Sequence, residues 1–372
     1  MNKKLLSVAV AAAIAAPTAA LADAVLYGKA HVSMDYFEIG DTSKDGDSFK
    51  GWTMSKGKRG KGNSRASRIG VKGSEKLTGG LKGIYQIELG VPLANESDYH
   101  LADGDRASIK LRNSYVGLES KWGTLLFGRH DTPFKLSTGR LEMFNDTMAD
   151  YEGTLHFHDV RADNTAAYMS PTWKGLSFAA AAVPGAASTV DGNRNDKSDG
   201  MEGYSVAAVY GNGPWHVSAA YEVLGSELGD IDSRVPTTTG EDFKKIRVGL
   251  GMVDFHGFTL TGLYENWKNG DTSDTNVKFV KDKEMDLWQL QTGYRFGNSM
   301  IKGMYGEAEP DTSGDTSGLK AKSWAVGLDH KFSKRTKVYA LYTKYDWKDR
   351  RNATADKEND WEGFSLGVIH NF

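Results

Sequence analysis

The chain is 372 residues long and nearly neutral, with 46 basic and 48 acidic residues, so it lacks the basic excess of a nucleic-acid-binding protein. It contains no cysteine, which excludes disulfide bonds and thiolate metal sites. The mean hydropathy is −0.49, and after residue 22 no apolar run approaches the roughly 18 residues of a membrane helix, which excludes a helical membrane protein. Membrane-spanning β-strands stay open, because each needs only about 9 to 11 residues and only every second one must be apolar.

The first 22 residues have the layout of a secretory signal peptide. Lys3 and Lys4 form a basic start, residues 5–16 form an apolar stretch too short to span a bilayer, and residues 20–22 form a small-x-small cleavage site. The alternative is an ordinary buried N-terminal helix. We expect an exported protein in which residues 1–22 are removed and residues 23–372 form one domain.

Apolar and polar side chains then alternate along many short segments. In residues 214–222 the apolar face reads Trp215, Val217, Ala219 and Tyr221. The same period of two recurs in residues 245–252 and 323–332. Such segments are typical of strands with one face against apolar surroundings and the other in water.

The connections between these segments are of two kinds. Short ones fall at residues 75–78, 120–123, 212–214, 297–299 and 333–336, and long polar ones at 40–64, 95–105, 185–200, 225–242, 268–283 and 350–360. Short periplasmic turns on one rim and long external loops on the other are typical of an outer-membrane barrel. We predict an all-β, transmembrane antiparallel β-barrel of about sixteen strands, a size that encloses a water-filled lumen. The alternative is a secreted all-β propeller or sandwich.

Four basic residues lie on predicted strands, where their orientation is decided by energy. A Lys or Arg that faces lipid near the midplane costs about 2 to 4 kcal/mol, and four such costs rival the net stability of a domain. We therefore expect all four to face the lumen. They are Lys29, Arg68, Arg112 and Arg161.

Residues 132–160 lie between two predicted strands and carry three acidic residues, Glu142, Asp146 and Asp150. Fixed charges of opposite sign across a narrow passage create a transverse field that orients polar solutes. We expect this segment to fold into the lumen as the third loop, with the acidic residues at the constriction. The alternative is a solvated acidic loop.

Five segments are similar to strands of a known family. They read LYGKA at 26–30, SRIGVKGSEKLTGGLKGIYQIE at 67–88, RNSYVGLESKWGTLLFGRH at 112–130, FSKRTKVYALYTKY at 332–345 and GVIHNF at 367–372. In this order they resemble the general diffusion porins of Gram-negative bacteria, over nearly the whole chain after residue 22. The resemblance implies a homotrimer of sixteen-stranded barrels in the outer membrane, each with its own channel for passive diffusion of small hydrophilic solutes and ions.

The resemblance also implies roles for single residues. It matches the four basic residues to the basic channel wall, and it places Glu142 and Asp146 opposite them. The Pro-Glu-Phe-Gly signature of enterobacterial relatives is absent, and residues 141–144 stand near its place. In similar proteins the barrel assembly machinery reads a terminal Phe, which here is Phe372 on an alternating strand. No cofactor or metal is expected, and outer-membrane lipid and lipopolysaccharide are the expected surroundings.

Weaker motifs and other functions remain as alternatives. Residues 51–59 only partly match a phosphate loop. The cations at positions 56, 58, 59 and 61 fit a solvated external loop, and the alternative is a contact with lipopolysaccharide phosphates. His156 and His158 share a face but are too few for a full metal site. Residues 191–202 carry Asp, Asn and Glu at the ligand offsets of a calcium loop but lack its glycine, and the alternative is a flexible polar loop. An outer-membrane hydrolase and a structural or adhesive barrel are the rival functions.

Overall fold

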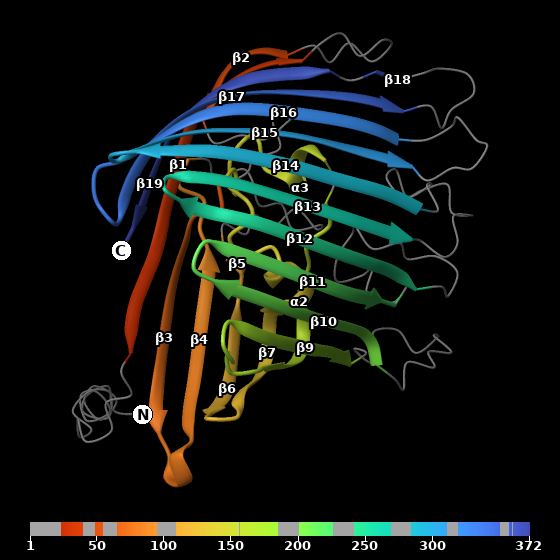
Figure 1. Ribbon diagram of the computed structural model, residues 1–372. Helices are drawn as coiled ribbons and strands as arrows, with labels where there is room; N and C mark the ends of the chain where they lie inside the picture. Colours follow the sequence, from red (N-terminus) through yellow and green to blue (C-terminus); the bar gives the residue numbers. More distant parts are fainter. Residues whose placement is uncertain are drawn as a thin grey trace, which may run out of the picture.

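The computed structural model describes residues 24–39, 49–54, 65–94, 109–155, 157–184, 201–225, 242–268, 284–310, 319–349, 357–358 and 360–372. These form one antiparallel sheet that rolls into a barrel (Figure 1). The strands are β1 (Val25–Ile39), β2 (Phe49–Met54), β3 (Arg68–Lys76), β4 (Lys82–Gly90), β5 (Lys110–Leu111), β6 (Ser114–Ser120), β7 (Gly123–Asp131), β8 (Arg161–Met169), β9 (Leu176–Pro184), β10 (Met201–Asn212), β11 (Trp215–Leu224), β12 (Phe243–Phe255), β13 (Phe258–Lys268), β14 (Glu284–Phe296), β15 (Ser299–Pro310), β16 (Leu319–Lys331), β17 (Thr336–Asp349), β18 (Lys357–Glu358) and β19 (Trp361–Asn371).

Three short strands share a wall position with a longer one. Strands β2 and β3 both pair with β1, β5 and β6 both pair with β4, and β18 and β19 both pair with β17. The wall therefore has sixteen strands, as predicted.

The barrel closes where β1 pairs with β19, from Lys29 opposite Asn371 to Ile39 opposite Trp361. Gly28 and Phe372 extend this ladder through two backbone hydrogen bonds of 2.9 and 3.1 Å. A Cβ atom on Gly28 would lie 2.3 Å from the Phe372 ring, so the glycine leaves room for that ring at the seam. Every wall strand thus has a partner on both sides, which leaves no open sheet edge.

The outer face of the wall is apolar and exposed. On β11, Trp215 and Tyr221 are 56% and 45% exposed, whereas His216 and Glu222, the residues that directly follow them, are buried on the inner face. The same inversion holds on β12, where Ile246 is exposed and its neighbours are buried. This confirms the predicted faces, and an apolar exterior fits a wall that meets lipid.

Seven short turns join the strands at one end of the barrel, where β1 also begins and β19 ends (Figure 1). Four of them have two residues, and two of these four, 213–214 and 297–298, place Gly213 and Gly297 at a φ of 57°, where other residues would be strained. The predicted short turns are therefore confirmed. The long connections at the other end, and the predicted signal peptide, lie mostly or wholly outside the described residues.

Only short helices occur among the described residues. The 3-10 helix η3 (Thr78–Gly80) lies in the turn between β3 and β4. Helices α2 (Pro133–Leu136) and α3 (Tyr151–Thr154) lie in the third loop, residues 132–160, and Figure 1 places both inside the barrel. No described helix is long and apolar enough to cross a membrane.

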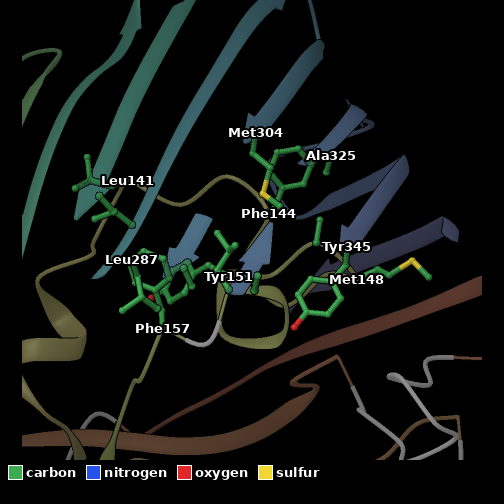
Figure 2. Packing of buried hydrophobic residues seen from close by; sticks show 14 of the residues in the cluster. Leu141, Phe144, Met148, Tyr151, Phe157, Leu287, Met304, Ala325 and Tyr345 are labelled. Carbon is green, nitrogen blue, oxygen red and sulfur yellow. The ribbon is translucent and has the colours of Figure 1, made fainter. Parts of the chain in front are cut away.

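A hydrophobic core fills the space between the third loop and the wall behind it. Leu141, Phe144 and Met148 of the loop pack there with Leu287 of β14 and Met304 of β15 (Figure 2). The predicted folding of the third loop into the lumen is therefore what the structure shows.

Candidate functional site: the channel constriction

Glycines on the inner face of the wall receive the apolar side chains of the third loop. A Cβ on Gly249 would lie 2.3 Å from Leu141, and a Cβ on Gly306 would lie 2.4 Å from Leu155. The fit at Gly327 is looser, since a Cβ there would lie 3.3 Å from the Phe144 ring. The loop's path along β12, β15 and β16 is thus set by where the wall lacks a side chain.

A buried ionic network fixes the returning limb of the third loop, the part that leads back into β8. Arg247 on β12 contacts Asp159 of the loop at 2.8 Å and donates from Nε to Glu265 on β13 at 2.9 Å. Tyr151 donates to the same Asp159 at 2.6 Å. Arg247 and Glu265 are fully buried, so these charges hold each other in a place where an unpaired charge would be costly.

A second buried network extends this attachment. Lys245 pairs with Glu222 at 2.6 Å and donates to the backbone carbonyl of His158 at 2.8 Å. The rings of Phe134 and Phe243 lie 4.4 and 5.8 Å from its ammonium group. Lys245 and Arg247 of β12 are therefore cationic anchors for the returning limb of the loop.

The outward limb, the part of the loop that runs from β7 to Phe144, is held by Lys302 on β15. Its ammonium group donates to the carbonyl of Met143 at 2.7 Å, pairs with Asp329 at 3.0 Å and lies 4.5 Å from the Phe144 ring. Gln291 adds an acceptor for the backbone N–H of Met143 at 2.7 Å. Both limbs of the loop are thus tied to the wall by side chains that the wall contributes.

The opposite inner wall is charged and open to water. Glu88 on β4 accepts from Arg112 at 2.7 Å, lies 3.7 Å from Arg68 and accepts from the Tyr27 hydroxyl at 3.0 Å. Lys29 on β1 reaches the loop and pairs with Asp146 at 2.7 Å. The structure therefore brings Lys29, Arg68 and Arg112 to the inner face.

Arg161 lies farther along, where the chain leaves β7 and returns in β8. It pairs with Asp131 at 2.9 Å, and Lys135 lies 3.6 Å from the same carboxylate. Asn113 links the two sides, accepting from Arg161 Nε at 2.7 Å and donating to Asp131 at 2.9 Å. Arg161 thus stands at the root of the third loop.

Of the three acidic residues predicted for the constriction, all of them described by the structure, Asp146 alone forms an ion pair with a residue of the predicted basic set. Asp146 adopts a φ of 60°, which aspartate tolerates better than most residues. Burial by itself would raise the pKa of Asp146, but the Lys29 ammonium reverses this and holds that pKa below its usual range. The ion pair with Lys29 therefore favours the ionised form of Asp146.

The other two acids are engaged within the loop. Asp150 is the N-cap of α3, accepting from the backbone N–H of Glu152 at 2.8 Å and of Asp146 at 2.7 Å. Glu142 accepts from the Asn145 side chain at 3.1 Å. Burial, with the charges of Glu152 and Asp146, raises the pKa of Asp150 to about 7. Burial and Asp150 likewise raise the pKa of Glu142 well above its usual value.

Two carboxylates at this site were missed by the sequence prediction. Glu88 and Asp131 are each shared by two cations. Glu88 stands between Ile87 and Leu89 on a strand, so the energy argument that turned the arginines inward applies to it as well. The alternation of Glu88 with these two apolar residues is the signal in the sequence that could have identified it.

The weaker motifs gain no support from the described residues. No group of three or more potential metal ligands occurs among them, and His158 there contacts Lys245 at 3.1 Å. His156, the loop lysines of residues 56–61 and most of the calcium-like segment lie outside the described residues.

Comparison with known proteins gives one consistent match. A family model described as Gram-negative porin matches residues 8–350. An outer membrane porin protein of Bordetella pertussis is 24% identical and a porin-like protein L of Photobacterium profundum is 28% identical, in both cases over 100% of each chain. Among solved structures, an anion-selective porin from Comamonas acidovorans is similar with a TM-score of 0.66 and 19% identity, covering 94% of this chain and 99% of that one.

Proposed function

Because this chain belongs to the Gram-negative porins and is an outer-membrane channel for small hydrophilic solutes, we propose that its inner wall and third loop select those solutes by charge. The observation that carries the proposal is the pairing of Lys29 with Asp146 beside the Glu88 cluster. It sets a charged wall against the tip of a loop inside the barrel.

The balance of charge favours anions. The ion pairs at the site join five cations to three carboxylates, namely Lys29, Arg68, Arg112, Arg161 and Lys135 to Asp146, Glu88 and Asp131. The raised pKa values of Glu142 and Asp150 reduce what those acids add at neutral pH. A passage with a net positive wall concentrates anions and repels cations.

The test is the reversal potential of single channels in a KCl gradient. Wild-type protein should prefer chloride, and Arg68→Gln/Arg112→Gln should move the reversal potential toward potassium. One charge 4 Å from an ion is worth about 4 kcal/mol at an effective dielectric of about 20, so even a strongly screened remnant is measurable. A shift toward chloride, or none, would show that these arginines do not control selectivity.

The assembly expected of such a channel is a homotrimer. The unheated protein should then migrate more slowly than the boiled monomer on a gel. A monomer by light scattering in mild detergent would refute it. We further propose that Phe372 serves the barrel assembly machinery: its deletion should lower the yield of folded protein and leave the conductance of assembled channels unchanged.

We propose that transport by this channel is passive and involves no catalysis. Ion conductance in a planar bilayer separates a pore from an adhesive or structural barrel. Hydrolysis of ester substrates by purified protein would favour the rival, an outer-membrane hydrolase. Lipopolysaccharide remains the proposed neighbour at the external end of the barrel.

A further inference from the structure

The periplasmic rim of the barrel has an unusual charge. We define this rim as the seven turns at 77–81, 121–122, 170–175, 213–214, 256–257, 297–298 and 332–335, with the strand residue on either side of each. All of these residues lie in the described part of the chain, and none is an aspartate or glutamate. The rim carries seven cations: Lys76, Lys82, Lys121, Lys174, Lys331, Lys334 and Arg335.

These cations are mostly left without carboxylate partners. Among the described residues, Lys82 alone of the seven has an ion pair, with Glu119 at 2.6 Å. The outer face near the opposite end of the strands differs, because most of its described lysines are paired, such as Lys50 with Glu38 at 2.9 Å and Lys322 with Glu307 at 2.7 Å, whereas Lys244 is not. Among the described residues, unpaired cations therefore prevail at the periplasmic rim and paired ones on the outer face at the opposite end.

Exposed aromatic rings place the rim cations at the level of lipid headgroups. Trp122 is 73% exposed with the Lys121 ammonium 5.1 Å from its ring, and Trp173, 53% exposed, directly precedes Lys174. Phe332, 66% exposed, lies in the turn that contains Lys334 and Arg335. Tryptophan and other aromatic side chains gather at the boundary between hydrocarbon and headgroups.

We propose that the periplasmic rim binds the headgroups of anionic phospholipids in the inner leaflet of the outer membrane. A phosphodiester accepts charge-assisted hydrogen bonds from ammonium and guanidinium groups. The rim supplies these donors around the barrel, and of its seven cations only Lys82 is engaged by a carboxylate among the described residues. The aromatic rings bind the adjoining acyl region. The lipids next to the protein are then enriched in anionic species on the periplasmic side.

The experiment measures lipid preference with the full-length channel. Mature protein is reconstituted in vesicles of phosphatidylcholine with a minor share of phosphatidylglycerol, and either lipid is brominated so that it quenches tryptophan fluorescence. In low salt, wild-type protein should favour phosphatidylglycerol about fivefold, the factor for one cation near an anionic surface. Because surface charge is screened, the preference should vanish in about 1 M salt.

Two matched variants locate the effect. In the rim variant Lys121, Lys174, Lys334 and Arg335 are changed to Gln, and in the control variant the paired outer-face lysines Lys50, Lys268, Lys320 and Lys322 are changed to Gln. The proposal expects loss of the preference in the rim variant alone, with trimer mobility and conductance unchanged in both variants.

Other outcomes overturn the proposal. No preference in the wild type, or an equal loss in both variants, would show that the rim does not select lipid. Binding of the channel to isolated peptidoglycan that depends on the rim residues, without a lipid preference, would assign the rim to the cell wall instead.

Discussion

The two halves of the inner wall use the same alternation of side chains for opposite purposes. Behind the third loop the inner face offers glycines, such as Gly249 and Gly327, and a dry core forms. Across the lumen, the inner faces of β1, β3 and β4 carry Lys29, Arg68 and Glu88. The alternation along a strand indicates which side chains face away from the lipid. Contact with the third loop then determines which of these are buried in the core and which face water.

The largest expected effect comes from removing the cation that anchors the dry half. Arg247→Met leaves Asp159 and Glu265 buried without their partner, which should cost about 3 to 5 kcal/mol and release the returning limb of the loop. We expect a lower temperature of unfolding in detergent, followed by circular dichroism, and noisy single-channel currents. Changing Asp159 to Asn and Glu265 to Gln in the same protein should restore most of the stability. A single variant as stable as the wild type would contradict the role of the network.

Filling a wall glycine should have the next largest effect. Gly249→Ala forces Leu141 aside, at a cost of about 1 to 3 kcal/mol for overpacking, and should move the loop toward the lumen and lower conductance. Gly303→Ala is the control, because the nearest atom to its Cβ would be 3.6 Å away. Leu141→Ala added to Gly249→Ala should recover the conductance. If the double variant conducts no better than Gly249→Ala, the glycine does not act through Leu141.

Two acids of the loop, Asp146 and Glu142, allow a test of how the water-facing half of the wall selects ions. Asp146→Asn removes an ionised carboxylate from Lys29 and should shift the reversal potential toward anions, by about 1 kcal/mol or less after screening. Glu142→Gln should shift it less, because the raised pKa of Glu142 already disfavours its charge. Equal shifts for the two variants would mean that both acids are ionised in the constriction.

The smallest effect concerns pH. Since the pKa of Asp150 is raised to about 7, its carboxyl is neutral below that pH and anionic above it. The anion preference should therefore decline as pH rises through neutrality. Asp150→Asn, which keeps a capping side chain, should flatten this dependence. A wild-type reversal potential that is constant between about pH 6 and pH 8 would argue against the titration.

The barrel itself was predictable because its signals are local. Alternation in β11 and β12, the short turns and the limits of the third loop at Asp131 and Arg161 all follow from neighbours along the chain. The inward orientation of Lys29 and Arg68 followed from the cost of placing a charge in lipid. These inferences need only the period of a strand and the nature of the solvent on each side.

The arrangement inside the barrel was less predictable, because it depends on contacts between distant segments. Nothing near Asp150 in the sequence distinguishes a constriction acid from a helix cap, and in the structure it caps α3. The sharing of Glu88 by Arg68 and Arg112 joins three wall positions. The anchoring of the loop by Lys302 spans 159 residues from Met143. Periodicity carries no information on such pairs.

The seam between β1 and β19 has a consequence for the timing of folding. Ser365 donates to Asp35 at 2.6 Å across 330 residues of chain, so one edge of the first strand has no partner until the last strand has been synthesised and exported. During that interval an unsatisfied edge is exposed, and exposed edges recruit other chains. Contacts of such long range also form slowly. Closure of the barrel therefore depends on preventing the early strands from pairing with other chains in the periplasm. The pairing of β1 with β19 is the step with which aggregation competes most.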